Sequence, residues 1–378
     1  MNLRQQLISS LRRVTSSGNY IPEIDGLRFI AIFFVVVMAH GGTYITNTVL
    51  GSEDKTSFRY QFLLEGVSGV SLFFIISGFI LAIPFAKEKL LQQQKVQLRP
   101  YYWRRVTRLE PVYIITLIIY FIFRVYFLKH ETFSELLPHF LASLFYVHNI
   151  AFDDHSLVNG VAWSLEVEIQ FYLLMPLFAL LYHIRPQKTR RVILLVLIIA
   201  GAAYSYTHQY HIANIFDKGC YFLGGMFLAD LYVQDKKNYN SNLYAIAGIS
   251  CFITSLFIPA YYVSMWFCIG KLFLMMGYFY WGIQNATLKK LLSFTPVTII
   301  GGMCYSIYLL HPGVIGLLMY SMAKIQFSEN IFINGGIHLF ITITSILIVS
   351  AVFFLLVEKP TMRKDWWKRK KITVYNQQ

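Results

Sequence analysis

Several ionisable side chains lie within long apolar stretches of this sequence. His40, Glu168 and His311 are each flanked by hydrophobic residues, and Arg28 precedes His40 in the same stretch. A charge in the hydrocarbon core of a membrane costs several kcal/mol or more, so such residues are functional candidates by default. A histidine beside a carboxylate can act as a general base, because the carboxylate orients and stabilises the imidazolium. The residue types therefore suit proton transfer by His40, Glu168 and His311.

Each of these residues also has a structural interpretation, which the residues alone leave open. His40 could pack between helices, Glu168 could form a salt bridge with an arginine, and His311 could mark a kink before Pro312.

A second chemistry is offered by Arg104, Arg105 and Arg108. Arg105 and Arg108 are three positions apart at the head of an apolar segment, so on a helix they share one face. Two guanidiniums on one face suit a phosphorylated ligand, because each can donate paired hydrogen bonds to phosphate oxygens. A basic cluster at a membrane interface is also typical of a topology anchor that contacts lipid headgroups.

The composition shows what must position these groups. The chain has 378 residues, of which 56% are hydrophobic and only 14% are charged, whereas a soluble domain carries about 25% charged residues. The bilayer is therefore the main solvent of this chain. A net charge of +14 could suggest nucleic acid, but the basic residues form short clusters between apolar runs. That pattern is the positive-inside pattern of a membrane protein. The four cysteines have no metal-binding spacing.

About ten segments are apolar enough to span a bilayer as helices of about 20 residues. They are 28–47, 66–86, 109–128, 161–183, 191–208, 214–233, 242–260, 263–283, 297–321 and 335–357. A shorter segment, 133–150, carries two histidines, a proline and a glutamate, and we interpret it as interfacial or re-entrant. Ten crossings place both termini on the same side of the membrane, and the positive-inside pattern predicts that this side is cytoplasmic.

The charges favour this count. With a cytoplasmic N-terminus, the basic clusters all fall inside, at 4–13, 87–108, 185–191, 236–237, 289–290 and 359–371. The outer loops keep only Lys55, Arg59, Lys129 and Lys324. An eleventh span at 133–150 would place the later clusters outside, against the positive-inside rule.

Helix rise then predicts the depth of each candidate. His40 lies 12 residues beyond Arg28, about 18 Å further out, and His311 lies about 20 Å from the inner end of its span. Glu168 lies about 10 Å below the outer end of its span. We therefore expect His40, Glu168 and His311 to share one layer in the outer half of the membrane.

Six segments occur in the order known from one protein family. They are Ile24-Asp25-Gly26-Leu27-Arg28 with His40 after it, Gly69 to Phe79, Tyr102 to Arg108, Trp163-Ser164-Leu165-Glu166-Val167-Glu168, Tyr305 to Pro312, and Glu358-Lys359-Pro360. With these segments the chain resembles the acyltransferase-3 family of membrane-bound O-acyltransferases, over nearly its whole length. Members of that family O-acylate surface polysaccharides, peptidoglycan, antibiotics and similar acceptors.

The resemblance implies roles for the intramembrane groups. Arg28 and His40 look like the arginine–histidine pair of the family, with His40 as the catalytic base. Glu168 resembles the acidic residue of the family's segment that begins here at Trp163. In the expected mechanism, Arg28 or a tyrosine steadies the oxyanion.

The resemblance also implies a donor site. Arg105 and Arg108, with Arg104 beside them, look like the family's arginines for the phosphates of acyl-CoA. Tyr305 and His311 match a late segment of the family and are further candidates.

Two departures from the family pattern bear on the site. Eleven residues separate Arg28 from His40, where the family usually has ten. On an ideal helix a spacing of 11 positions returns to within about 20°, whereas 12 positions end about 120° round. Either a π-bulge absorbs the extra residue, or Arg28 and His40 face different cavities. In addition, Ser71 stands where many members carry aspartate, which bears on the acceptor site.

These observations predict an all-α polytopic membrane bundle of about ten helices. We expect an interfacial segment over 1–22, an acyltransferase-like membrane domain over 23–360 and a basic cytoplasmic tail over 361–378. The expected activity is the transfer of an acyl group, in the first place acetyl, from cytoplasmic acyl-CoA, without a metal. The expected acceptor is a hydroxyl of a surface glycan, such as lipopolysaccharide O-antigen or exopolysaccharide, at the bacterial inner membrane. A flippase for a lipid-linked glycan is the alternative, since it too would bury ionisable residues.

Overall fold

The computed structural model describes residues 3–14, 20–49, 57–129, 131–208, 214–235, 239–259, 264–322, 324–363 and 366. Within these ranges the chain is helical, and the β-structure found there is an isolated bridge between Tyr239 and Asn285. Most of the basic tail predicted over 361–378 lies outside the described residues.

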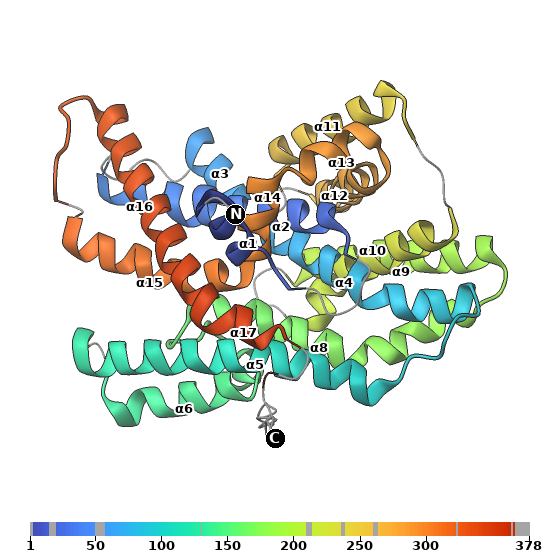
Figure 1. The fold of residues 1–378 in the computed structure, drawn as a ribbon, viewed down its shortest axis with the longest axis horizontal. Helices are drawn as coiled ribbons and strands as arrows, with labels where there is room; N and C mark the ends of the chain where they lie inside the picture. Colours follow the sequence, from blue (N-terminus) through green and yellow to red (C-terminus); the bar gives the residue numbers. More distant parts are fainter. Residues whose placement is uncertain are drawn as a thin grey trace, which may run out of the picture.

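The helices follow one another through the described residues (Figure 1). The α-helices are α1 (Leu3–Leu11), α2 (Pro22–Phe33), α3 (Phe58–Leu64), α4 (Ser68–Leu90), α5 (Leu98–Ile122), α6 (Phe133–Leu144), α7 (His148–Phe152), α8 (Trp163–Phe178), α9 (Gln187–Thr207), α10 (Ile215–Gln234), α11 (Asn242–Phe257), α12 (Met265–Gln284), α13 (Ala286–Leu292), α14 (Thr295–Gly302), α15 (Cys304–Met322), α16 (Ile331–Phe353) and α17 (Lys359–Thr361). The π-helices are η1 (Phe34–Gly42), η2 (Ile45–Val49), η4 (Phe123–Leu128) and η7 (Phe354–Glu358), and 3₁₀ turns cover Glu65–Val67, Gly160–Ala162 and Ala179–His183.

Eight helical segments of the described residues are long and apolar enough to cross a membrane. They are Pro22–Asn47, Phe58–Leu90, Leu98–Leu128, Gly160–His183, Gln187–Thr207, Met265–Gln284, Cys304–Met322 and Ile331–Thr361. Each coincides with one of the ten predicted spans, so the chain is an all-α, multi-pass membrane protein.

The other two predicted spans, 214–233 and 242–260, form α10 and α11, which are not among these eight segments. α11 is apolar but has only 16 residues. α10 has 20 residues and buries three charged side chains, Asp217, Lys218 and Asp230. α10 also packs closely on α4, because a Cβ atom at Gly78 would lie 2.2 Å from the carbonyl oxygen of Phe222. Such small residues let membrane helices approach each other.

The first span changes its helical geometry part-way along. α2 passes directly into the π-helix η1, which carries His40. A π-helix closes i→i+5 hydrogen bonds, so each of its residues turns through less than the 100° of an α-helix. The offset of about 120° expected between Arg28 and His40 on an ideal α-helix is thereby reduced. The first of the two expected outcomes, a change to π-helix, is thus present, but among the described residues Arg28 lines the cavity described below and His40 does not.

The segment predicted as interfacial or re-entrant forms α6 and α7. α6 has 12 residues and a length of about 18 Å, which is too short to cross a hydrocarbon core of about 30 Å. It runs back along α5 (Figure 1): Phe133 contacts Phe121, and further down the Tyr113 hydroxyl donates to the carbonyl of Ser143 over 3.0 Å. The segment therefore folds back along α5 and returns the chain to the bundle, as the re-entrant interpretation expects, and we call it the re-entrant segment.

The re-entrant segment moves the start of α8. The amide of Asn159 donates to the carbonyl of Leu309 over 3.3 Å, and the Tyr308 hydroxyl donates to the carbonyl of Val161 over 3.1 Å. Both partners lie in the first half of α15, so α8 begins deep within the bundle. The predicted depth of Glu168 is consequently wrong, because it assumed that this span starts at the membrane surface.

Candidate functional site

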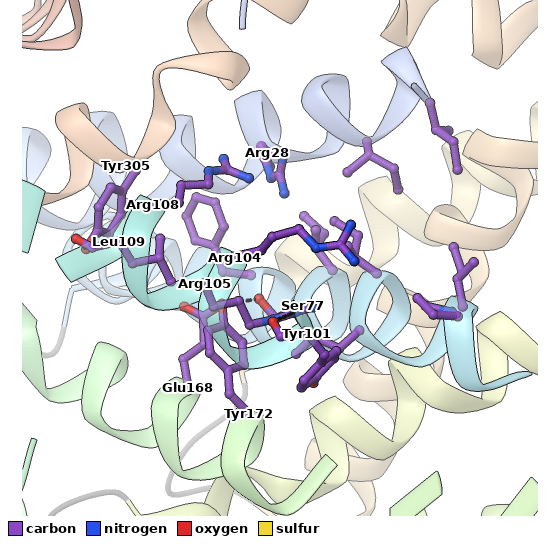
Figure 2. A pocket seen from close by; sticks show the side chains of 18 of the residues that line it. Arg28, Ser77, Tyr101, Arg104, Arg105, Arg108, Leu109, Glu168, Tyr172 and Tyr305 are labelled. Atoms are coloured by element: carbon purple, nitrogen blue, oxygen red, sulfur yellow. Dashed lines mark hydrogen bonds between the residues drawn. The ribbon is translucent and has the colours of Figure 1, made fainter. Parts of the chain in front are cut away.

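A cavity of about 1010 Å³ lies among the helices that carry the motif residues. Its wall is built from α4, the first half of α8 and the first turns of α2, α5 and α15, with the loop 93–97 at one end. Figure 2 shows the arginines of α2 and α5 facing this space. Seven Lys or Arg side chains and three carboxylates line it, so its wall carries excess positive charge.

The arginines of α5 are directed into this cavity. Arg104 donates from Nε to the carbonyl of Pro100 over 3.0 Å, and Arg105 donates from Nη1 to the carbonyl of Tyr101 over 2.9 Å. The guanidinium of Arg105 also stacks 3.9 Å from the centre of the Tyr101 ring. Within the described part of the chain, Arg104, Arg105 and Arg108 form no ion pair with a carboxylate. The predicted shared face of Arg105 and Arg108 is thus a cationic wall open to an anion.

Glu168 lies beside this cationic wall and not beside His40. Its carboxylate accepts hydrogen bonds from the hydroxyls of Ser77 and Tyr172 (Figure 2), and the charges of Arg105 and Arg108 act on it. No hydrogen bond joins Glu168 to His40 among the described residues. The expected pairing is corrected, because the deep start of α8 places Glu168 at the level of the arginines.

His40 is paired with the other histidine of the predicted set. Nδ1 of His40 lies 3.1 Å from Nε2 of His311 and 3.1 Å from the carbonyl oxygen of Val35. Nδ1 of His311 lies 2.8 Å from the carbonyl oxygen of Tyr308. A carbonyl only accepts, so in the neutral rings both Nδ1 atoms carry the proton. This tautomer leaves the lone pair of His40 on Nε2, which is the atom that a base needs.

Tyr308 separates the cavity from the histidine pair. It lines the cavity, its ring centre lies 5.8 Å from that of His311, and its hydroxyl lies 2.7 Å from Oγ of Ser164. The cavity lining of the described residues includes neither His40 nor His311. The histidines therefore lie one helical turn beyond the cavity, behind Tyr308.

Arg28 lines the cavity and is tied to an acid of the same helix. Nη1 of Arg28 lies 2.7 Å from Oδ1 of Asp25, which is buried. Figure 2 shows Arg28 on the side of the cavity where Arg108 lies. Its geometry suits an anion in the cavity better than the expected role at an oxyanion beside His40.

The remaining candidates divide between the cavity and its surroundings. Tyr305 lines the cavity and donates to the carbonyl of Leu109 over 3.2 Å. Trp163 packs on Phe74 at the start of α8, and Ser71 is buried on α4, but neither lines the cavity among the described residues.

Sequence reasoning missed that the carboxylate of Asp25 is the shared hydrogen-bond acceptor for three side chains. Asp25 accepts from Arg28, from Arg13 and, over 2.9 Å, from the hydroxyl of Tyr20. Partial burial and the charge of Asp25 raise the pKa of Tyr20, which keeps the hydroxyl protonated as a donor. The sequence signal for this role is that Asp25 precedes Arg28 by three residues at the start of an apolar stretch, which places both on one helix face.

Sequence reasoning also missed Glu358, whose carboxylate reaches the cavity. It accepts from the backbone N–H of Ser306 over 3.0 Å and from the Ser306 hydroxyl. These bonds tie the end of the last span to the start of α15, and the charge of Glu358 acts on Arg108.

Comparisons with known proteins agree on one family. The model of a family described as an acyltransferase domain matches residues 21–356. The O-acetyltransferase OatA of Staphylococcus aureus is 25% identical over 384 residues, a match that covers 93% of this chain and 58% of that protein. The peptidoglycan O-acetyltransferase OatA of Listeria monocytogenes is 27% identical over 348 residues, covering 81% of this chain and 51% of that protein. The chain thus spans little more than half the length of these relatives. No solved structure gives a significant match.

Proposed function

Because the chain belongs to the acyltransferase family whose model matches residues 21–356, we propose that it is a membrane O-acyltransferase that uses acyl-CoA. The group transferred is in the first place acetyl, and the acceptor is a hydroxyl of a cell-envelope glycan. Two relatives are named as O-acetyltransferases, and one of them as acting on peptidoglycan. Peptidoglycan is therefore an acceptor to test beside lipopolysaccharide and exopolysaccharide.

The observation that carries this proposal is the cationic wall of the cavity. Arg104, Arg105 and Arg108 hold no carboxylate partner within the described residues, and guanidiniums bind phosphate oxygens through paired charge-assisted hydrogen bonds. The CoA part of the donor carries several phosphate oxygens and no positive group near them. The positive-inside bias supports a cytoplasmic position for this end of the cavity, on the side where acyl-CoA is made.

The chemical step follows from the histidine pair. The acyl arm extends from the arginines along α15 past Tyr308 toward the histidine pair. The arm has to span about 9 Å along that helix, because Tyr305 in the cavity and His311 are six residues apart. Nε2 of His40 removes the proton of the acceptor hydroxyl as its oxygen attacks the thioester carbonyl. A C–O bond forms, the C–S bond breaks, and the proton passes to the leaving thiolate.

The neighbours of His40 have distinct parts in this step. His311 and the carbonyl of Val35 both accept from Nδ1 of His40, so His311 helps to orient the ring and is a positioning residue. Glu168 balances the charge of Arg105 and Arg108 and holds Tyr172, so it belongs to the donor site.

The proposal is tested by CoA binding to the full chain in detergent, measured by calorimetry. The double variant Arg105→Ala with Arg108→Ala should weaken binding at least a hundredfold, since charge-assisted hydrogen bonds are worth about 1.5–3 kcal/mol each. The matched control is Arg99→Ala, an exposed arginine of the same helix outside the cavity lining. No CoA binding by the unchanged protein would contradict the proposal and favour a flippase.

A further inference from the structure

The first helix of the chain docks against the side of the bundle where α15 begins. The ammonium group of Lys359, in α17, donates to the carbonyls of Ser9 and Ser10 at the end of α1. A lysine on the last carbonyls of a helix satisfies their free acceptors and complements the helix dipole. A Cβ atom at Gly302, the last residue of α14, would lie 3.4 Å from Cβ of Arg13. The segment is thus held in place beside the cavity.

This docking brings Arg13 into the cavity wall. Arg13 lines the cavity and, with a side chain 12% exposed, lies 3.1 Å from Oδ1 of Asp25. The same oxygen is 2.7 Å from Arg28, so two guanidiniums share one carboxylate oxygen. Nε of Arg13 is buried without a hydrogen-bond partner in the described structure. Its donor capacity is therefore only partly used.

The charge around Arg13 does not balance within the protein. Arg13 acts on Arg108 by like-charge repulsion, and Glu358 attracts both arginines without an ion pair to either among the described residues. Three guanidiniums, those of Arg13, Arg28 and Arg108, thus face two carboxylates, those of Asp25 and Glu358. Asp25 supplies one negative charge to Arg13 and Arg28 together. Like charges held close together raise the free energy unless an anion lies among them. A phosphate group bound beside Arg13, Arg28 and Arg108 would remove this cost.

We propose that Arg13 is a phosphate-binding residue of the donor site, which α1 delivers to the cavity from outside the family's matched region. The inference rests on the proposed use of acyl-CoA, and it extends the binding site to a segment before residue 21. It assigns α1 the task of completing the anion-binding wall beside α2 and α5.

The test is calorimetric binding of two probes to the full chain in a maltoside detergent, which carries no phosphate to compete. The probes are CoA and pantetheine, which lacks the phosphates. Arg13→Ala should weaken CoA binding about tenfold and leave pantetheine binding unchanged. Arg13→Lys should recover part of the loss, because it keeps the charge without the fork. Arg12→Ala is the matched control, since Arg12 is its exposed neighbour and does not line the cavity.

The outcomes separate this inference from the proposed function. Equal CoA affinity in Arg13→Ala and Arg12→Ala would overturn the role of Arg13 while leaving the acyl-CoA proposal intact. An equal loss of affinity for CoA and pantetheine would also overturn it, because a residue that only stabilises the fold would affect the binding of both probes alike. Absence of CoA binding in the unchanged protein would instead contradict the proposed function itself.

Discussion

Nε2 of His311, on α15, accepts a hydrogen bond from Nδ1 of His40, on the π-helix η1, across 3.1 Å. The bond joins the first span to the ninth predicted span and links the two histidines that sequence reasoning selected. It replaces the expected carboxylate with a neutral imidazole as the group that orients the base. It also leaves Nε2 of His40 free to accept a proton.

Removal of His311 should therefore lower turnover without affecting the donor site. His311→Ala is expected to reduce acyl transfer about tenfold to a hundredfold, because His40 loses one of the two acceptors that orient its ring. The affinity for CoA should stay within twofold. The control is His338→Ala, which removes another buried histidine bonded to a backbone carbonyl, outside the cavity lining. Unchanged turnover in His311→Ala would contradict the positioning role.

Glu168→Gln distinguishes a donor-site carboxylate from a partner of His40. The change removes one negative charge from beside Arg105 and Arg108, so CoA should bind more tightly, about fivefold. The pH dependence of turnover should stay as it is, because no hydrogen bond joins Glu168 to His40 in the described structure. Calorimetry and a pH series on the purified protein give both quantities. A shifted pH profile with unchanged CoA affinity would contradict the donor-site role and show that Glu168 acts on His40.

Tyr308 should act as the barrier between the cavity and the histidine pair. Replacement by alanine removes the ring and its hydrogen bond to Ser164, which lets water reach the thioester. Tyr308→Ala should therefore hydrolyse acetyl-CoA several times faster than the unchanged protein when acceptor is absent. The measurement is release of free CoA thiol over time. Tyr320→Ala, at an exposed site of the same helix, should not raise this rate; equal rates in both variants would refute the barrier.

Glu166 should stabilise the re-entrant segment. This fully buried carboxylate accepts from the backbone N–H of Asn149 over 2.8 Å, so it ties α7 to α8. Glu166→Ala should cost about 1–3 kcal/mol, seen as a lower Tm in detergent and faster proteolysis of the loop 153–157. Glu166→Gln keeps an acceptor oxygen, so its Tm should lie between those of the unchanged protein and Glu166→Ala. Equal Tm values in all three proteins would exclude this anchoring role.

Much of the fold could be predicted because a bilayer constrains sequence strongly. Apolar length located the eight long membrane helices, and a π-helix was one of the two outcomes expected from the extra residue between Arg28 and His40. The spacing of Arg105 and Arg108 likewise predicted that they share one face of a helix, which is a local property, and both line the cavity.

The depth and partners of the remaining groups depend on tertiary structure. Glu168 was placed too far out because apolar length cannot reveal that α8 begins deep in the bundle, after the re-entrant α6. Arg13 was counted only as a topology charge, because its approach to Asp25 requires the contact between α1 and Lys359. Contacts between residues distant in sequence leave no periodic pattern in the sequence.

The central claim is that His40 is the base of an acyl transfer to an envelope glycan. The most direct measurement is mass spectrometry of glycans from cells that carry His40→Ala, beside His183→Ala as an exposed-histidine control, at equal membrane abundance. We predict that O-acetyl groups are lost in His40→Ala and retained in His183→Ala. Full acetylation in cells whose only copy is His40→Ala would contradict the account.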